Sequence, residues 1–206
     1  MIVLKMKMNT RRVSVSHSPN YSHDVITIEC EDVILREYRI EDLDALHNLT
    51  WQPHFHAFLL DWNVTREQRE EWINQYEIPE NRRFIDAVSE GKDIGELRLR
   101  LGIIHKSTGE FIGVCGTGIL DRVSPPSREI YYGISSTHQN KGYTTQAARG
   151  LITYLFENTN TSELIAIAQT RNVPSNKVIQ KCGFVFQHDL TIEDREYHYY
   201  KLRKNL

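Results

Sequence analysis

The sequence predicts a mixed α/β (α+β) fold built on one central sheet. Two observations carry this prediction. The segment 129–168 has the pattern of strand, long helix and strand, a unit whose two strands are parallel and whose crossover is right-handed. The segment 96–120 alternates apolar and polar residues on both sides of a turn at 106–109, which predicts an antiparallel hairpin. A sheet with both kinds of pairing belongs to the mixed class.

Length and charge favour one ordinary globular domain. The chain has 206 residues, with 25 Lys and Arg against 27 Asp and Glu, which gives a formal net charge of −2. This length suits one domain with a terminal arm, and the charge argues against a broad cationic surface for nucleic acid. The sequence shows neither the ~18 consecutive apolar residues of a membrane span nor a signal peptide. We therefore expect a cytoplasmic protein with no nucleic-acid or membrane partner.

Cysteine and histidine spacing predicts no metal site. Cys30, Cys115 and Cys182 are odd in number, widely spaced and without a CxxC pair, which favours a reducing compartment over a disulfide framework or a zinc site. His54 and His56 with Asp61 are the alternative ligand set. They lack further ligands at convincing spacing, so histidines of a surface or a pocket are the preferred interpretation.

The first third of the chain contains an arm, a strand and two helices. Residues 1–30 form an arm in which 25–28 has the pattern of a short edge strand, and the domain occupies 31–206. A strand is expected at 33–36. Leucines at three-residue spacing then predict a helix, namely Leu43, Leu46 and Leu49. The capping-box pattern that begins at Thr65 predicts a second helix that runs to about Tyr76.

The rest of the chain alternates strands and helices. Apolar spacing and turn residues predict strands at 96–105, 110–120, 129–134, 164–168, 184–188 and 196–202, with helices at 142–157 and 175–182. The run 164–168 is apolar throughout, as in a strand that is buried on both faces. Gly183 supplies a left-handed residue at the end of the second of these helices. The glycines of 113–118 are spaced G-x-x-G-x-G, but no helix follows them, so a strand is preferred over a nucleotide-binding loop.

The segment Gln139-Asn140-Lys141-Gly142-Tyr143-Thr144 has the composition of an anion site. It joins a predicted strand to a predicted helix, and a helix N-terminus offers free N–H groups and partial positive charge. Gly142 allows a phosphate to approach the backbone, and Lys141 adds a cation. A loop that only caps the helix is the plainer alternative for a single glycine.

Two motifs in this order resemble the GNAT N-acetyltransferase superfamily. The segment 139–144 resembles the acetyl-CoA signature Q/R-x-x-G-x-G/A, and Asn172 to Phe184 resembles the second motif N-x-x-S-x-x-x-x-x-K-x-G-F. Residues 34–43 resemble the branch of the ribosomal-protein N-terminal (RimJ/RimL-like) acetyltransferases. The resemblance covers about 33–203. It implies the GNAT fold, a mixed central sheet of about six to seven strands with a splayed parallel pair and about four flanking helices.

The resemblance also implies acetyl-CoA as co-substrate, without a metal, and names the residues that hold it. The pyrophosphate is expected on the amides of the segment 139–144, and the pantetheine between strands 129–134 and 164–168. The implied binding residues are Ile134, Gln139, Asn140, Lys141, Gly142, Tyr143, Thr144, Asn172 and Asn176. Thr144 departs from the motif, which has Gly or Ala there.

Catalytic roles follow from the same resemblance. Glu129 stands in the E-I-x-x context of a general base, and Ser175 is the expected acid because Ile179 occupies the position where many members carry tyrosine. Asn172 is expected to bond the pantetheine or to position a water. A solvated strand-end acid is the alternative for Glu129.

The expected reaction is direct acetyl transfer to a primary amine in a ternary complex. The acceptor is either a protein N-terminal α-amine or a small molecule such as a polyamine or aminoglycoside, and a regulatory acyl-CoA-binding module without turnover is the alternative. Aromatic residues are the candidates for the wall of an acceptor pocket or for plain core, namely Trp51, Phe55, Phe58, Trp62 and Trp72. The chain is expected to be a monomer or a homodimer.

Overall fold

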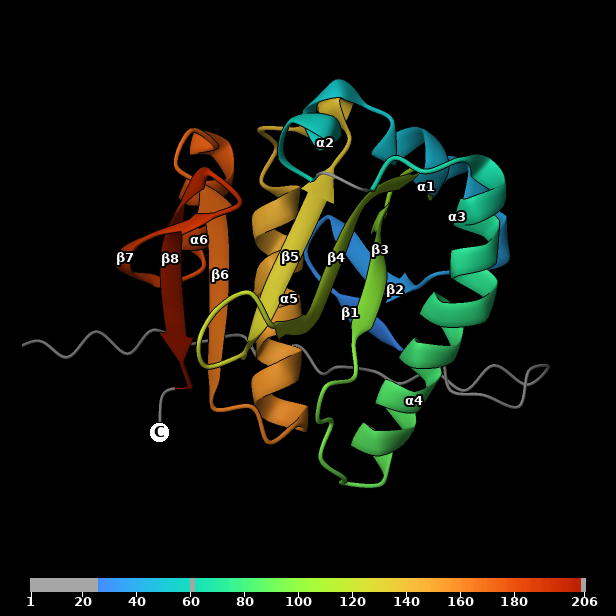
Figure 1. Cartoon of the computed structure of the whole chain (residues 1–206). Helices are drawn as coiled ribbons and strands as arrows, with labels where there is room; N and C mark the ends of the chain where they lie inside the picture. Colours follow the sequence, from blue (N-terminus) through green and yellow to red (C-terminus); the bar gives the residue numbers. More distant parts are fainter. Residues whose placement is uncertain (1–25, 60–61, 205–206) are drawn as a thin grey trace, which may run out of the picture.

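The computed structural model describes residues 26–59 and 62–204, which form one mixed sheet with helices on both faces (Figure 1). The sheet has eight strands in the order β1-β2-β3-β4-β5-β6-β8-β7. Their bounds are Thr27–Glu29 (β1), Val33–Glu37 (β2), Leu99–His105 (β3), Phe111–Leu120 (β4), Ser127–Ile134 (β5), Glu163–Gln169 (β6), Val185–Ile192 (β7) and Arg195–Arg203 (β8). The β5–β6 pair is parallel and the other neighbours are antiparallel. The mixed class is therefore confirmed.

The sheet has one strand more than the six to seven expected of the domain, because the arm adds β1. This strand pairs antiparallel with β2 at one edge of the sheet, and it overlaps the short edge strand expected at 25–28. The number of helices was also too low, because the described residues contain six α-helices rather than about four. Their bounds are Leu43–Thr50 (α1), Pro53–Phe58 (α2), Arg66–Trp72 (α3), Ile78–Ser89 (α4), Tyr143–Asn158 (α5) and Val173–Lys181 (α6).

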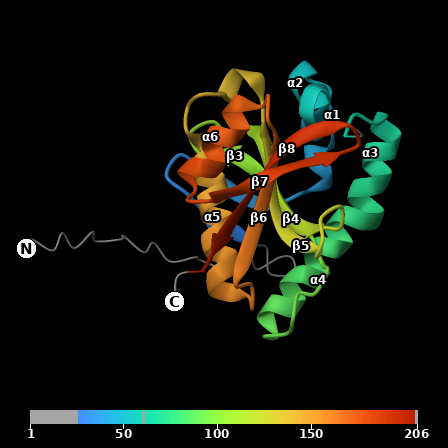
Figure 2. The same ribbon diagram turned by 60° about the vertical axis from the view of Figure 1, so that its left-hand side comes forward.

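Two helix layers enclose the sheet. Figure 2 shows α5 and α6 on one side of it and α1 to α4 on the other. The larger core lies under α5 and includes Leu99, Leu101, Ala147 and Leu151, all fully buried. A smaller cluster under α1 to α3 contains Tyr38, Leu43, Leu46, Leu49, Phe55, Ile73 and Val114. Burial of these apolar side chains on both faces is the main favourable contribution to the stability of this fold.

Helices α3 and α4 are joined by a π-helical turn, Ile73–Glu77, so that they form one irregular helix. The predicted start is confirmed, because Thr65 Oγ1 accepts a hydrogen bond of 3.2 Å from the amide of Gln68. The predicted end near Tyr76 was wrong, since the helix continues to Ser89. Isolated π turns of this kind are rare and are found mostly at functional sites.

The parallel pair β5–β6 opens into a splay. Glu129 and Ile165 form the register pair that these strands share in the described part of the chain. Beyond it the two strands diverge toward the top of Figure 1. The β5–α5–β6 crossover places the N-terminus of α5 at the open end of this splay, as expected of a βαβ unit.

Candidate functional site

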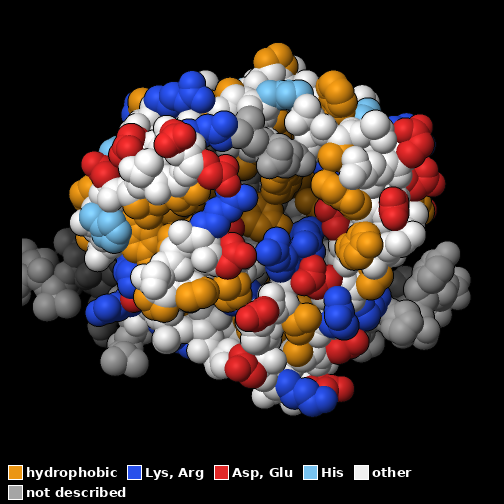
Figure 3. Space-filling view, viewed as in Figure 1, with side chains coloured by type: hydrophobic (Ala, Val, Ile, Leu, Met, Phe, Trp, Pro, Cys, Tyr) orange, Lys and Arg blue, Asp and Glu red, His pale blue; other side chains and the backbone are white. Residues whose placement is uncertain are grey.

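A large cleft runs along the splay of β5 and β6. Its volume is about 1190 Å³, and residues of α3, α4, α5, α6 and of the β7–β8 turn also line it. Figure 3 shows this face of the molecule hollowed near its centre, with hydrophobic side chains at the floor and charged side chains around it. Single-ligand pockets usually measure ~300–1,000 Å³. The cleft is thus large enough for two substrates.

The open end of β5 presents backbone groups to the cleft. The amide of Ser135 donates to the carbonyl of Ile112 (2.7 Å). Because hydrogen-bonded pairs alternate in an antiparallel ladder, the amide and carbonyl of Ile134 face away from β4 and toward the splay. His54 Nε2 donates to the Ile134 carbonyl (2.7 Å), so of these two groups the amide is the one without a partner among the described residues.

The N-terminus of α5 has the features of an anion-binding site. Gly142 is its N-cap, with φ +85°, and the described residues provide no side-chain cap for the first amides of this helix. A Cβ added to Gly142 would meet no heavy atom within 4 Å, so the space in front of these amides is open. The glycine is therefore needed for its left-handed backbone, which other residues adopt at a cost of ~1–2 kcal/mol.

The other residues of the 139–144 segment are divided between cleft and surface. Gln139, Asn140, Tyr143 and Thr144 line the cleft together with Gly142, whereas Lys141 is exposed and lies outside the lining. The hydroxyl of Tyr143 is hydrogen-bonded to His105 Nε2 (3.2 Å). This side chain is held by the fold, whereas the backbone amide of Tyr143 is one of the first amides of α5.

The start of α6 forms the opposite wall. Asn172 Oδ1 caps this helix by accepting from the amide of Ser175 (3.3 Å), and both residues line the cleft. The hydroxyl of Tyr132, on β5, donates to the carbonyl of Ser175 (3.0 Å). Burial raises the pKa of Tyr132, so this phenol stays protonated. Tyr132 was not predicted as a site residue, because its contact with Ser175 joins residues 43 positions apart.

Asn176 is not brought into the cleft. It is buried, and its Nδ2 donates to the carbonyls of Gln169 (3.0 Å) and Asn172 (2.9 Å). Its Oδ1 accepts from the hydroxyl of Tyr200 (2.9 Å). All polar groups of this side chain are therefore used to join α6 to β6 and β8.

Glu129 lies in a row of residues that crosses three strands. Gly118 of β4 is its register partner, and Arg98, which directly precedes β3, lies on the other side of Gly118. A Cβ added to Gly118 would lie 3.1 Å from Cγ and 3.3 Å from Cδ of Arg98, so the arginine stem occupies the space of the missing side chain. Burial raises the pKa of Glu129 from 4.5 to about 7, and Arg98 opposes this shift. A carboxyl group with this pKa is suited to proton transfer near neutral pH.

A second row of the same kind lies beside the first. Arg100 pairs with Gly116, and Gly116 pairs with Tyr131. A Cβ added to Gly116 would lie 2.5 Å from Cζ of Tyr131, so the phenol ring lies across β4 toward Arg100. The G-x-x-G-x-G spacing is thus explained by a strand whose last two glycines form a trough, which confirms the prediction of a strand.

Helices α3 and α4 close the cleft with a buried polar wall. Arg69 Nη2 donates to the carbonyl of Trp62 (2.5 Å), and its Nη1 lies 3.5 Å from Glu77 Oε1. Glu77 is the last residue of the π turn, and its Oε2 is buried without a hydrogen-bond partner among the described residues. Arg100 Nη1 is held by Glu80 Oε2 (2.6 Å). This wall was not predicted from the sequence, because the π turn shifts the helical phase.

The aromatic candidates divide between the cleft and the surface. Phe55, Phe58, Trp62 and Trp72 line the cleft, whereas Trp51 is 48% exposed and lies outside its lining. Phe55 is also part of the smaller core. Asp61, of the alternative metal set, is outside the described residues. In the part of the chain that the structure describes, no three His, Cys, Asp or Glu side chains are grouped as metal ligands.

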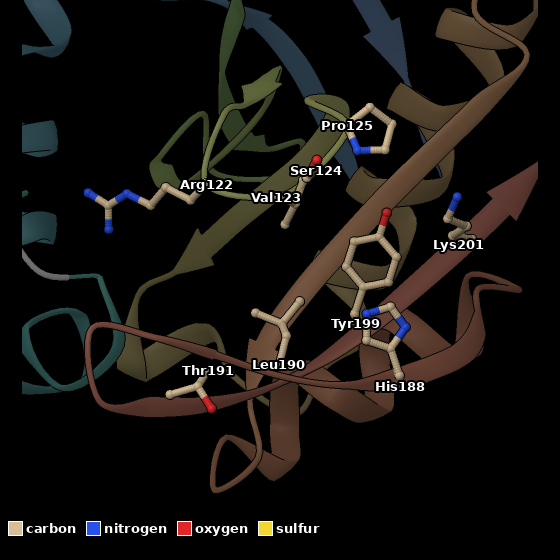
Figure 4. A pocket seen from close by; sticks show the side chains of 9 residues that line it. All are labelled: Arg122, Val123, Ser124, Pro125, His188, Leu190, Thr191, Tyr199 and Lys201. Carbon is tan, nitrogen blue, oxygen red and sulfur yellow. The ribbon is translucent and has the colours of Figure 1, made fainter.

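A second cavity of about 320 Å³ lies between the loop 122–125 and the β7–β8 hairpin (Figure 4). His188 and Tyr199 stack there at 4.9 Å, and Lys201 of its rim is bonded to Glu163 (2.8 Å). The N-terminal residues of α5 and α6 line the larger cleft and not this cavity. The chemistry is therefore expected in the larger cleft. Within the described residues, no helix has the length and apolar character that a bilayer crossing requires.

Comparisons with known proteins agree with this geometry. Residues 32–185 match the family model described as acetyltransferase (GNAT) domain. The uncharacterized N-acetyltransferase p20 of Bacillus licheniformis is 27% identical over 158 residues, which are 77% of this chain and 82% of that protein. A GNAT-family acetyltransferase from Bacillus anthracis has a TM-score of 0.67 at 19% identity, with coverage of 86% of this chain and 98% of that one. The ribosomal L7/L12 α-N-protein acetyltransferase RimL, in complex with coenzyme A, has a TM-score of 0.66 at 15% identity, with coverage of 86% and 97%.

Proposed function

The chain belongs to the acetyltransferase (GNAT) domain family and is an acetyl-CoA-dependent N-acetyltransferase. We propose that it acetylates a primary amine by direct attack in a ternary complex. The observation that supports this most is the meeting of three features in one cleft. These are the open N-terminus of α5, the splayed end of β5 and the half-buried carboxyl group of Glu129.

The coenzyme half of the cleft is formed by α5, β5 and α6. The first amides of α5, with Gly142 as N-cap, would bind the pyrophosphate, because a helix N-terminus combines free donors with partial positive charge. The amide of Ile134 would donate to the pantetheine or to the oxyanion that develops on the thioester carbonyl. Asn172 would act mainly through the orientation of α6, since its side chain already caps that helix.

Glu129 would take the proton of the acceptor amine. At pH 7 deprotonation costs about 1 kcal/mol for an α-amine and about 4–5 kcal/mol for a lysine side chain, from their ordinary pKa values. A carboxyl group with a pKa of about 7 is matched to the first of these tasks. The amine nitrogen then forms its bond to the thioester carbon, the carbon–sulfur bond breaks, and CoA leaves as a thiolate.

The thiolate needs a proton, and two hydroxyl groups lie on the wall formed by β5 and α6. Ser175 is the candidate from the sequence, and its side chain lines the cleft. Tyr132 lies on the same wall, with its hydroxyl on the carbonyl of Ser175. Ile179, at the position where many family members carry the tyrosine acid, is buried and offers no proton.

The test is turnover with a panel of amines. The full chain is incubated with acetyl-CoA and with N-terminal peptides, amino acids, polyamines or aminoglycosides, and free thiol and acetylated product are measured. Thiol release that depends on an amine, with acetylated product in equal amount, supports the proposal. Tight binding of acetyl-CoA without release for any amine would contradict it and favour the regulatory module.

A further inference from the structure

We propose that the acceptor carries a carboxylate close to its reacting amine, and that Arg98 binds this carboxylate beside Glu129. This inference rests on the proposed function and adds the chemical class of the acceptor. The shared chemistry is that of a free α-amino acid or of a peptide N-terminus with an acidic side chain nearby.

Arg98 lies beside Gly118, the register partner of Glu129. Glu129 is opposite Gly118 in the β4–β5 pair, and Arg98 directly precedes Leu99, which pairs with Thr117. Residues directly opposite in a sheet present their side chains on the same face. The arginine stem lies over Gly118, within 3.1–3.4 Å of where a Cβ would be. Arg98 and Glu129 both line the cleft. A cation and a proton acceptor therefore stand side by side in the part of the cleft that lies outside the coenzyme half, which we call the acceptor half.

The arginines of the acceptor half are only partly paired with carboxylates. The acceptor half contains five arginines and four glutamates, namely Arg69, Arg98, Arg100, Arg122 and Arg195 against Glu77, Glu80, Glu129 and Glu193. Three of these arginines have a carboxylate partner, at 3.5 Å for Arg69, 2.6 Å for Arg100 and 3.1 Å for Arg122. No hydrogen bond or ion pair within the described residues holds the guanidinium of Arg98 or Arg195.

This balance discriminates between acceptor classes. A polyamine or an aminoglycoside brings only positive charge into a half whose carboxylates do not outnumber its arginines, so its binding is opposed. A zwitterion places its ammonium group at Glu129 and its carboxylate at Arg98. The guanidinium group is suited to this because its planar donors match a carboxylate in two parallel hydrogen bonds.

Matched acceptors test the inference. One set is phenylalanine, phenylalaninamide and phenethylamine, which differ in the α-carboxylate. A second set is a pair of C-terminally amidated peptides with Asp or Asn at the second position. Spermidine and kanamycin represent the cationic class. We expect the carboxylate form in one set to have a kcat/KM roughly tenfold or more above its neutral partner, as for a hydrogen-bonded charge pair. The set that shows the preference identifies the source of the carboxylate.

The variant Arg98→Gln should reduce this preference to about twofold or less, mainly through a higher KM for the carboxylate form, and Arg98→Lys should restore part of it. The matched control is Arg83→Gln, on the exposed side of α4 and outside the cleft, which should keep the parental preference. Equal use of neutral and carboxylate forms, turnover of cationic acceptors alone, or an undiminished preference in Arg98→Gln overturns the inference and leaves the proposed function intact. Failure of every acceptor to release thiol overturns both.

Discussion

Replacement of Glu129 by glutamine should separate its catalytic role from its structural cost. In the parent, kcat/KM should rise with pH and level off above about 7, because only the ionised carboxyl group accepts the amine proton. The Glu129→Gln variant should lose this inflection and fall in rate by roughly 10²–10⁴-fold, the usual contribution of a general base. The groups that face this carboxyl are Arg98, Asp121, Arg122 and Tyr131, and all remain in the variant.

The same variant should be more stable than the parent at high pH. The pKa of Glu129 is about 7 in the folded chain and 4.5 as its ordinary value, so the fold favours the protonated form. Its ionisation therefore destabilises the parent progressively between these two pH values and fully above pH 7, whereas glutamine stays neutral throughout. By linkage, the advantage of Glu129→Gln in free energy of unfolding should be about 2 kcal/mol larger at pH 8.5 than at pH 5.5.

Urea unfolding at both pH values measures this difference, and thiol release across pH measures the rate. Glu157→Gln, an exposed substitution on α5, is the matched control and should change neither quantity. A pH–rate profile that overlays the parental one would refute the role of Glu129 as base. A stability difference that is the same at pH 5.5 and pH 8.5 would refute the assignment of a raised pKa, independently of the kinetics.

Three further substitutions test other parts of the site. Gly142→Glu should weaken acetyl-CoA binding by roughly 100-fold or more in calorimetry, since like charges a few ångströms apart cost several kcal/mol; Gly142→Ala adds only backbone strain, and equal losses in both would contradict an anion site. Ser175→Ala should slow the chemical step in single-turnover experiments if its hydroxyl protonates the thiolate, whereas an unchanged rate, with a loss in Tyr132→Phe instead, would assign the proton to the phenol. Asn176→Ala should destabilise the fold by about 2–4 kcal/mol in urea, because buried partners lose their hydrogen bonds; an intact stability with weaker acetyl-CoA binding would return Asn176 to the binding site.

Periodicity predicted the elements whose burial pattern is regular. The hairpin of β3 and β4, the helix α5 and the buried strand β6 lie within one to three residues of their expected bounds. Helix α2 was missed because its six residues are too few to show a period and begin at a proline. Helix α4 was missed because the π turn before it shifts the apolar positions, and Pro79 suggests a break where it only begins a new helical segment.

The proposed coenzyme half is described by local motifs, because its proposed binding groups are consecutive in the sequence. The segment 139–144 and the start of α6 carry their own helix termini, so a local motif describes them. The acceptor half depends on register between distant strands. Arg98 approaches Glu129 only because β3, β4 and β5 align across Gly118, and a sequence contains no direct signal of that alignment.

Because β5 and β6 share a single register pair in the described part of the chain, the sheet consists of two weakly joined parts. One contains the five strands β1 to β5, and the other contains the three strands β6, β8 and β7. Beyond that pair the smaller part is joined to the larger through α5, through the Tyr132–Ser175 hydrogen bond and through the Arg122–Glu193 ion pair. A substrate bound in the splay would form hydrogen bonds with both strands where β5 and β6 do not pair, in the position of an additional strand. Binding would then stabilise the packing of the C-terminal strands against the rest of the sheet, because any ligand that binds only the folded state stabilises it. Release of product would remove this stabilisation, so the C-terminal strands would become more rigid and then more flexible in each catalytic cycle.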